Sequence, residues 1–224
     1  MSSGVAAFLK QVASSPVPVV TGQRGRLMFA MDATASRAPT WGQAIGIQAE
    51  MFKEAATVGG LDVQLVYYRG LMEFDASAWT ADANRMVEQM RRVSFLSGQT
   101  QIERILHHAA DETKYKKVNA VVFIGDAMEE PADLIEAAAG KLGLMGVPVF
   151  IFHEGGEEPA ASVFRRVAAI TRGAYAAFDA SSPQKLRDLL KAVAVYAAGG
   201  AKALSDYSKK TGGEALRLTA QVKG

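Results

Sequence analysis

The sequence predicts a three-layer α/β fold, Rossmann-like and doubly wound, in which helices cover both faces of a mostly parallel sheet. Three observations support this fold class. Apolar runs of strand length alternate with segments of helical periodicity along most of the chain. Several of these runs are almost uniformly apolar, which is typical of parallel strands buried on both faces. Glycine and proline residues mark the turns between the segments.

The elements of the first half follow from these patterns. A continuous apolar run predicts the first central strand, and Pro39 suits the first turn of the helix after it. Gly59 and Gly60 end that helix, and the next strand alternates apolar and polar side chains, as expected nearer a sheet edge. The predicted elements are a helix at 5–13, a strand at 27–31, a helix at 41–58, a strand at 61–67, a segment pairing beside it at 71–74, and a helix at 80–92.

The second half repeats the alternation of helix and strand. Apolar residues at helical spacing predict the helices, and continuous apolar runs predict the strands. Ser182 and Pro183 are expected to cap and begin the last helix of the domain. The predicted elements are helices at 101–114, 132–144, 159–171 and 184–198, and strands at 118–124, 147–152 and 175–178.

We therefore expect one domain with an extension at each end. In the C-terminal extension we expect a helix at 201–210, followed by alternating apolar residues at Leu216, Leu218 and Ala220. The predicted organisation is a lead-in at 1–26, the domain at 27–198 and a tail at 199–224.

The composition limits the classes of partner and compartment. A length of 224 residues suits a single domain, and a formal net charge of +2 is too small to attract nucleic acid or an anionic membrane. The chain contains no cysteine, which excludes thiolate metal sites and favours a reducing compartment. Residues 1–20 lack the features of a secretory signal, and no apolar run approaches the roughly 20 residues of a membrane-spanning helix. We therefore expect a soluble cytoplasmic protein.

Oxygen-bearing side chains follow two of the predicted central strands and precede one helix. Asp32, Thr34 and Ser36 come directly after the first strand. Asp126 follows the strand at 118–124, and Thr100 precedes the next predicted helix. Ligands of open α/β sheets gather at the carboxyl ends of the strands, and Mg²⁺ takes about six oxygen ligands, waters included. We therefore predict that these five side chains hold a divalent cation, Mg²⁺ in preference to Mn²⁺ or Ca²⁺.

The motifs around these residues resemble those of von Willebrand factor type A domains. Asp32-Ala33-Thr34-Ala35-Ser36 resembles the family's Asp-x-Ser-x-Ser motif, with threonine in the middle serine position. Ser97-Gly98-Gln99-Thr100 resembles its glycine-containing loop with a metal-binding threonine. Ile124-Gly125-Asp126 resembles the strand that ends in the third-motif aspartate. The three motifs occur in the family's order, and the resemblance spans residues 27–198.

The resemblance implies a von Willebrand factor A fold with a metal-ion-dependent adhesion site. It implies that the hydroxyls of Thr34, Ser36 and Thr100 bind the metal directly, whereas the carboxylates of Asp32 and Asp126 bind it either directly or through water. It also implies that a partner protein completes the coordination with an acidic side chain, so that the cation bridges two proteins. We therefore expect a non-enzymatic binding module, working in a bacterial-type intracellular assembly.

Two other functions share an acidic sheet end with Mg²⁺. A Mg²⁺-dependent phosphoryl-transfer or hydrolase enzyme is one, but the chain has no Walker-type phosphate loop and no lysine directly beside Asp32, Thr100 or Asp126. A phospho-acceptor receiver domain needs a paired acidic cluster after the first strand, where this chain has hydroxyls. Other charged residues near the site are interpreted as helix ends or solvated loops and are left out of it. They are Glu129, Glu130, His153, Glu154, Glu157 and Glu158. The alternative for the last four is that they shape the surface that meets the partner.

Overall fold

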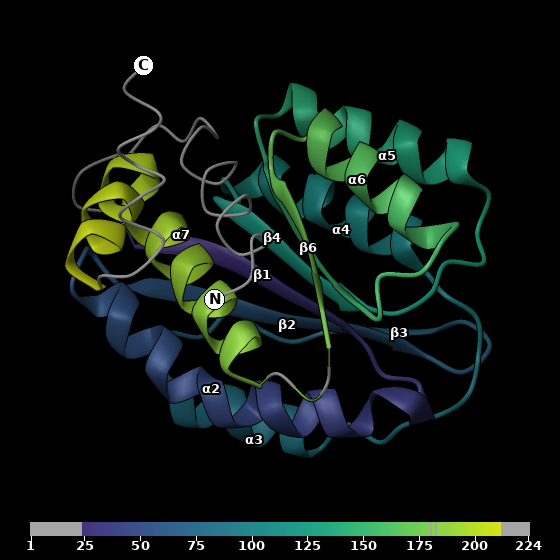
Figure 1. Ribbon diagram of the computed structural model, residues 1–224, viewed down its shortest axis with the longest axis horizontal. Coiled ribbons are helices and arrows are strands. Elements are labelled where there is room, and N and C mark those ends of the chain that lie inside the picture. Colours follow the sequence, from purple (N-terminus) through teal and green to yellow (C-terminus); the bar gives the residue numbers. More distant parts are fainter. Residues whose placement is uncertain (1–23, 180, 182, 212–224) are drawn as a thin grey trace.

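A six-stranded sheet forms the centre of the molecule (Figure 1). The computed structural model describes residues 24–179, 181 and 183–211. The strands are β1 (Gly25–Asp32), β2 (Leu61–Arg69), β3 (Glu73–Ala76), β4 (Ala120–Gly125), β5 (Val149–Glu154) and β6 (Ala174–Phe178). Their order is β3-β2-β1-β4-β5-β6, with β3 antiparallel to β2 and all other neighbours parallel. The predicted mostly parallel, doubly wound sheet is confirmed.

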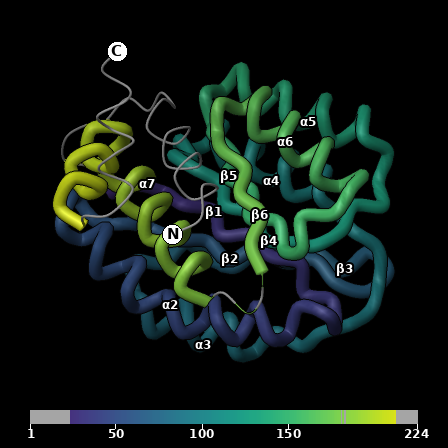
Figure 2. The backbone as a smooth tube through the Cα atoms, viewed as in Figure 1, coloured from purple at the N-terminus to yellow at the C-terminus, as the bar shows by residue number. Residues whose placement is uncertain are grey.

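Helices cover both faces of this sheet, and Figures 1 and 2 show the two layers. The helices are η1 (Ala35–Arg37, a 3-10 turn), α2 (Ala38–Ala56), α3 (Ala83–Arg91), α4 (Ile102–Tyr115), α5 (Ala132–Leu144), α6 (Ala160–Ile170) and α7 (Pro183–Thr211). Helices α2, α3 and α7 bury their apolar residues in one core cluster, and α4, α5 and α6 bury theirs in a second cluster on the opposite face. None of the helices in the described part of the chain combines the length and apolarity needed to cross a bilayer.

The central strand β1 explains why its sequence is uniformly apolar. Successive side chains of a strand point to opposite faces of the sheet. Leu27, Phe29 and Met31 belong to the core cluster of α2, α3 and α7, whereas Met28 and Ala30 belong to the cluster on the other face. Every residue of β1 is buried. A strand at this position therefore buries apolar side chains in both directions, as the sequence pattern predicts.

The helices and strands predicted between residues 27 and 198 are present, with boundaries displaced by a few residues. The segment expected to pair at 71–74 is shifted toward the C-terminus, because Gly70, with φ of 57°, begins a turn. Strand β3 starts at Glu73, and the turn leaves Leu71 and Met72 with 76% and 74% of their surface exposed. These two apolar residues therefore lie in solvent rather than in the sheet.

The segment labelled α7 is two helices joined at a kink, in agreement with the separate helices predicted at 184–198 and 201–210. It runs from Pro183 to Thr211. Gly200 interrupts its helical backbone with φ of 72°, a conformation that glycine adopts without side-chain strain. Three predictions lie outside the described residues, namely the helix at 5–13, the cap at Ser182 and the alternation of Leu216, Leu218 and Ala220.

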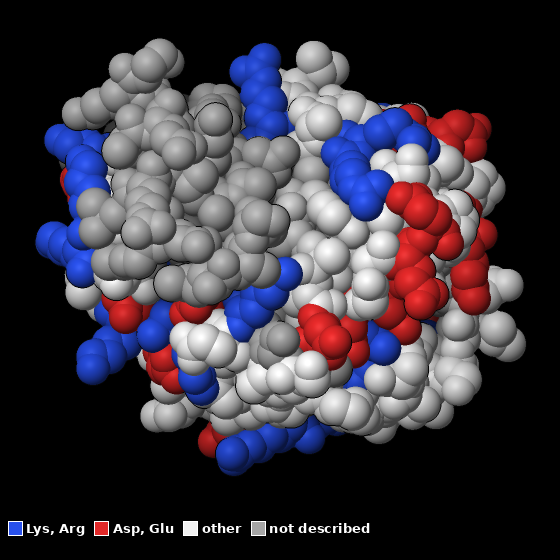
Figure 3. Space-filling model, in the orientation of Figure 1, with Lys and Arg blue, Asp and Glu red and all other residues white. Residues whose placement is uncertain are grey.

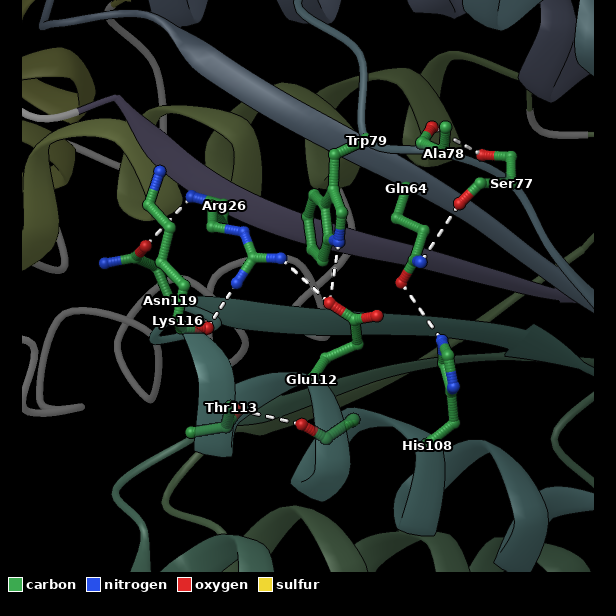
Figure 4. A network of polar contacts seen from close by, with 11 residues as sticks. Arg26, Gln64, Ser77, Ala78, Trp79, His108, Glu112, Thr113, Lys116 and Asn119 are labelled. Carbon is green, nitrogen blue, oxygen red and sulfur yellow. Dashed lines mark hydrogen bonds and ion pairs between the residues drawn. The ribbon is translucent and has the colours of Figure 1, made fainter.

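A polar network ties the amino end of β1 to α4 (Figure 4). The guanidinium of Arg26 donates to Glu112 at 2.9 Å and lies 3.8 Å above the centre of the Trp79 ring. The Trp79 indole also donates to Glu112, at 2.8 Å. Burial works against the charge on Glu112, yet the hydrogen bonds from Trp79 and Arg26 hold its pKa below its ordinary value. Because Arg26 is 6% exposed, Glu112 is the group that compensates its buried charge.

We expect Glu112→Ala to lower the free energy of unfolding by about 3 kcal/mol, because removing one partner of a buried ion pair leaves the other charge uncompensated. Asp111→Ala is the matched control, since Asp111 is an exposed partner of Lys114 on the same helix, and it should leave stability nearly unchanged. Denaturant unfolding at pH 7 measures both. Similar losses in the two variants would show that Arg26 does not depend on Glu112.

Candidate metal site

The predicted ligands lie where the strand order of the sheet reverses. Strands β1 and β4 are neighbours, and the chain leaves β1 toward η1 and α2 on one face but leaves β4 toward α5 on the other. Asp32 is the last residue of β1, and Asp126 directly follows β4. The carboxyl ends of strands at such a switch point form the crevice in which open α/β folds bind ligands.

The first loop presents one buried carboxylate and two accessible hydroxyls. Asp32 is 2% exposed, and its Oδ1 accepts a hydrogen bond from the Thr34 amide at 2.7 Å. This contact folds the loop back on the end of β1, as short polar side chains do at turns. The hydroxyls of Thr34 and Ser36 lie 3.2 Å apart and reach solvent. Hydrogen bonds therefore link three of the five predicted ligands in a row, from Asp32 to Thr34 and from Thr34 to Ser36.

Thr100 is held by the loop that follows β4. Its amide donates to Glu129 Oε2 at 3.1 Å, and its hydroxyl accepts from the Glu129 amide at 2.9 Å. Glu130 accepts from the amides of Ile102 and Glu103, both at 2.8 Å, at the start of α4. The sequence pattern favoured the two glutamates as charges in the first turn of the helix that follows them. They instead bind backbone amides in front of α4 and at its first turn, where a helix favours negative charge.

A buried arginine joins Asp126 to the first loop. Arg37, directly after Ser36, forms an ion pair with Asp126, in which its Nη2 lies 3.0 Å from Oδ2, and a second, close ion pair with Glu154 at the end of β5. Its Nε lies 3.4 Å from the Ser36 hydroxyl, and Thr40 also donates to Glu154. The sequence pattern did not predict Arg37 at the site, and it favoured a solvated loop for Glu154. The register of β4 with β5, in which Gly125 lies beside His153, brings that glutamate to the site.

His153 is fully buried beneath Asp126, not solvated as the sequence analysis expected. Its Nε2 lies 2.9 Å from the Asp126 carbonyl oxygen, so Nε2 carries a proton and donates it. Its Nδ1 lies 3.0 Å from the Tyr175 hydroxyl, which then acts as the donor to the neutral ring. Burial lowers the pKa of His153 and favours this neutral form. The imidazole therefore fixes the main chain at Asp126.

The contacts connect the five predicted ligands unequally. Asp32, Thr34 and Ser36 form one group, Asp126 joins it through Arg37, and Thr100 is tied to the Asp126 loop through Glu129. Among the residues that the structure describes, no hydrogen bond joins Thr100 directly to the first loop. Within the described chain, no cluster of three or more Asp, Glu and His side chains is placed to hold a metal ion. A metal site at this position therefore depends on the hydroxyl oxygens.

The electrostatics of the site centre on Asp32. Burial raises its pKa from 3.8 to about 6, against the lowering effect of the hydrogen bonds from Thr34. Tyr68 lies beside it in the β1–β2 register, and burial, followed by the charge of Asp32, raises the pKa of the Tyr68 hydroxyl well above its ordinary value. A carboxylate, three hydroxyls and a second carboxylate match the oxygen ligands of a hard divalent cation.

An acidic pocket of about 480 Å³ opens next to Asp126. Arg37 and Glu154 line its wall together with Glu157 and Asp179 from neighbouring loops. Figure 3 shows acidic side chains gathered on the right of the visible face, beside α6. The sheet end therefore carries an excess of negative charge that favours a cation.

Comparison with family models gives no match, and neither does comparison with curated proteins. Solved structures do match. The VWA domain of SpRpn10 has a TM-score of 0.60 at 14% identity, covering 75% of this chain and 94% of that chain. A von Willebrand factor type A protein from Catenulispora acidiphila has a TM-score of 0.59 at 16% identity, covering 77% and 43%.

A third structure is proximal thread matrix protein 1 from the mussel byssus, described with a zinc-occupied MIDAS motif. Its TM-score is 0.58 at 15% identity, covering 77% of this chain and 46% of that chain. This chain therefore spans less than half of the second and third proteins. The three likenesses show that the chain has the fold of von Willebrand factor type A domains, as its motifs predict.

The raised pKa of Asp32 predicts a loss of stability with rising pH. Between about pH 4 and pH 6 the folded protein binds a proton at Asp32 more tightly than the unfolded chain does, so stability falls as pH rises through this window. Asp32→Asn should remove that loss and stabilise the metal-free protein at pH 7 by about 2 kcal/mol, with little difference at pH 3.5. Denaturant unfolding with a chelator measures it. An Asp32→Asn protein no more stable than wild type at pH 7 would contradict the burial argument.

The Thr100 loop packs too closely on the β2–β3 turn to accept a side chain at Gly98. A Cβ there would lie 1.8 Å from the Gly70 carbonyl oxygen, which also accepts from the Gln99 amide at 3.2 Å. Gly98→Ala should therefore cost about 2 kcal/mol and weaken Mn²⁺ binding by displacing Thr100. Gly140→Ala in α5 is the control, since nothing lies within 4 Å of its Cβ position. Thermal unfolding and titration of both variants test this, and a neutral Gly98→Ala would contradict it.

Proposed function

We propose that this chain is a binding module that holds a divalent cation through Asp32, Thr34, Ser36, Thr100 and Asp126 and uses it to capture a partner protein. The observation that carries the proposal is the buried Asp32 carboxylate, which faces the switch point of the sheet beside accessible hydroxyls. The structural comparisons support the fold on which this proposal rests, that of von Willebrand factor type A domains. Mg²⁺ is the cation we propose on the oxygen ligand set.

The residues of the site have separate tasks in this function. Asp32 supplies the charge that attracts the cation, and Thr34 and Ser36 turn hydroxyl oxygens toward it from the same loop. Thr100 closes the site from the start of α4, held in place by Glu129. Asp126 completes it from the end of β4. When bound, the cation supplies an open coordination position for an anionic oxygen.

We propose that the partner offers an acidic side chain to that position. The apolar turn residues Leu71 and Met72, together with Leu96, supply a surface beside it. The Gly70 amide donates to the Leu96 carbonyl, and the Leu96 amide donates to the Ala33 carbonyl, so the turn is tied to the Asp32 loop. A partner that combines a carboxylate with apolar contacts fits both features. We place this interaction in an intracellular assembly, as the lack of cysteine suggests.

A binding role suits the site better than phosphoryl transfer. Arg37, the cation that contacts Asp126, is already paired with two carboxylates and is not free to neutralise a phosphate. The chain also has no glycine-rich phosphate loop of the Walker type. Metal-dependent hydrolysis of a generic phosphoester would favour the enzymatic alternative.

Calorimetric titration of Mg²⁺ and Mn²⁺ into metal-stripped protein tests the site. Wild type should bind saturably, Asp32→Asn should not bind detectably while remaining folded, and Thr34→Val should bind more weakly because it loses a hydroxyl oxygen ligand. Thr57→Val is the matched control, since Thr57 lies at the far end of α2 and should leave binding unchanged. No binding to wild type, or equal binding by Asp32→Asn, would refute the proposed site.

The acidic partner group has its own test. Acetate added to the Mn²⁺-loaded protein should displace a metal-bound water and lower the relaxation enhancement of water protons, whereas methylammonium should not. Mn²⁺ binding without any acetate effect would retain the metal site and rule out the bridging role.

A further inference from the structure

We propose that Arg37 is a resident cation of the site, holding Asp126 one water away from a bound metal and stabilising the site when it is metal-free. The proposal rests on the proposed function, because it assumes that the residues around Asp32 take up a divalent cation. In this proposal the guanidinium and the metal ion both compensate the negative charge of the same carboxylates at one end of the sheet. Removing the guanidinium would strengthen the attraction between those carboxylates and the metal ion.

The guanidinium lies between the ends of two neighbouring strands. The Arg37 side chain is 9% exposed and binds Asp126 after β4 and Glu154 at the end of β5. Its third contact, 3.4 Å to the hydroxyl of Ser36, is with another predicted ligand. The planar fork of arginine suits a position between two carboxylates, and its charge persists at every physiological pH. Arg37 is therefore built into the site rather than lying over it.

These contacts determine how Asp126 can serve a metal. Its Oδ2 is ion-paired with the guanidinium at 3.0 Å, and its carbonyl oxygen accepts from His153 at 2.9 Å. A metal that ligated the same carboxylate directly would lie close to the guanidinium, and the two cations would repel each other. An intervening water separates them and still transmits the carboxylate's charge. Water-mediated coordination is therefore the route that this arrangement favours for Asp126.

The charge balance of the site depends on the same residue. Asp32, Asp126 and Glu154 carry three negative charges when ionised, and Arg37 carries one positive charge. With the guanidinium present, a divalent cation brings these four side chains to neutrality, which lessens the repulsion that an anionic partner group meets. Without it, the same cation would sit in a net negative site that holds the metal more tightly. Arg37 thus lowers metal affinity and favours the acidic partner.

The experiment removes the charge of Arg37 and measures metal affinity directly. Arg37→Gln retains hydrogen-bond donors but no charge, and titration of Mg²⁺ and Mn²⁺ should show binding about tenfold tighter than in wild type. In metal-free protein its thermal unfolding midpoint should fall by roughly 5 °C, because Asp126 and Glu154 then repel each other. Arg37→Met is a second charge-removing variant if Arg37→Gln fails to fold.

Two further variants separate charge from packing. Arg37→Lys keeps the charge and loses the fork, and its metal affinity should stay within about threefold of wild type. The double variant Arg37→Gln with Glu154→Gln removes one charge of each sign, so its affinity should return toward that of wild type. A folded charge-removing variant that bound metal equally or more weakly would overturn the proposal, since a merely structural arginine predicts that loss. Absence of saturable binding in both wild type and Arg37→Gln would instead refute the metal site on which it rests.

Discussion

A carboxylate buried at the end of the central strand is the constraint around which this sheet end is organised. Asp32 is almost completely removed from solvent, and burial raises its pKa to about 6. The Thr34 amide compensates its charge in part. A buried, incompletely paired charge costs folding free energy, and such costs are typical of residues kept for binding. The buried charge of Asp32 therefore destabilises the fold locally, and a bound cation would reduce that cost.

The neighbouring carboxylates are paired, which isolates Asp32 as the target for a cation. Arg37 engages Asp126 and Glu154, while the backbone amides in front of α4 and at its first turn engage Glu129 and Glu130. Each pairing also fixes a loop, because the two partners come from different strands or helices. The same contacts therefore compensate the charges of these carboxylates and hold the loops in position.

The sheet topology gives the site its second feature, an apolar border. The β2–β3 turn is hydrogen-bonded to the loop before Thr100, which in turn is hydrogen-bonded to the Asp32 loop. Close packing of Gly98 on Gly70 leaves no room for a side chain between them. Leu71 and Met72 are exposed on this turn. A charged centre with apolar residues beside it is an arrangement suited to protein recognition, in which charge orients a partner and apolar contact adds affinity.

The layers of the fold could be predicted from local sequence, because burial on one or both faces of a strand or helix leaves a periodicity in the apolar residues. The same local sequence groups Asp32, Thr34 and Ser36, because they are close in the chain and follow a recognisable strand. The roles of Arg37 and Glu154 depend on the sheet, since these residues are 117 positions apart and meet because β5 lies beside β4. The burial of His153 was equally invisible, because a charged residue near a strand end looks the same in sequence whether a helix covers it or water does. Charge pairing across strands depends on register in space, and no local pattern encodes it.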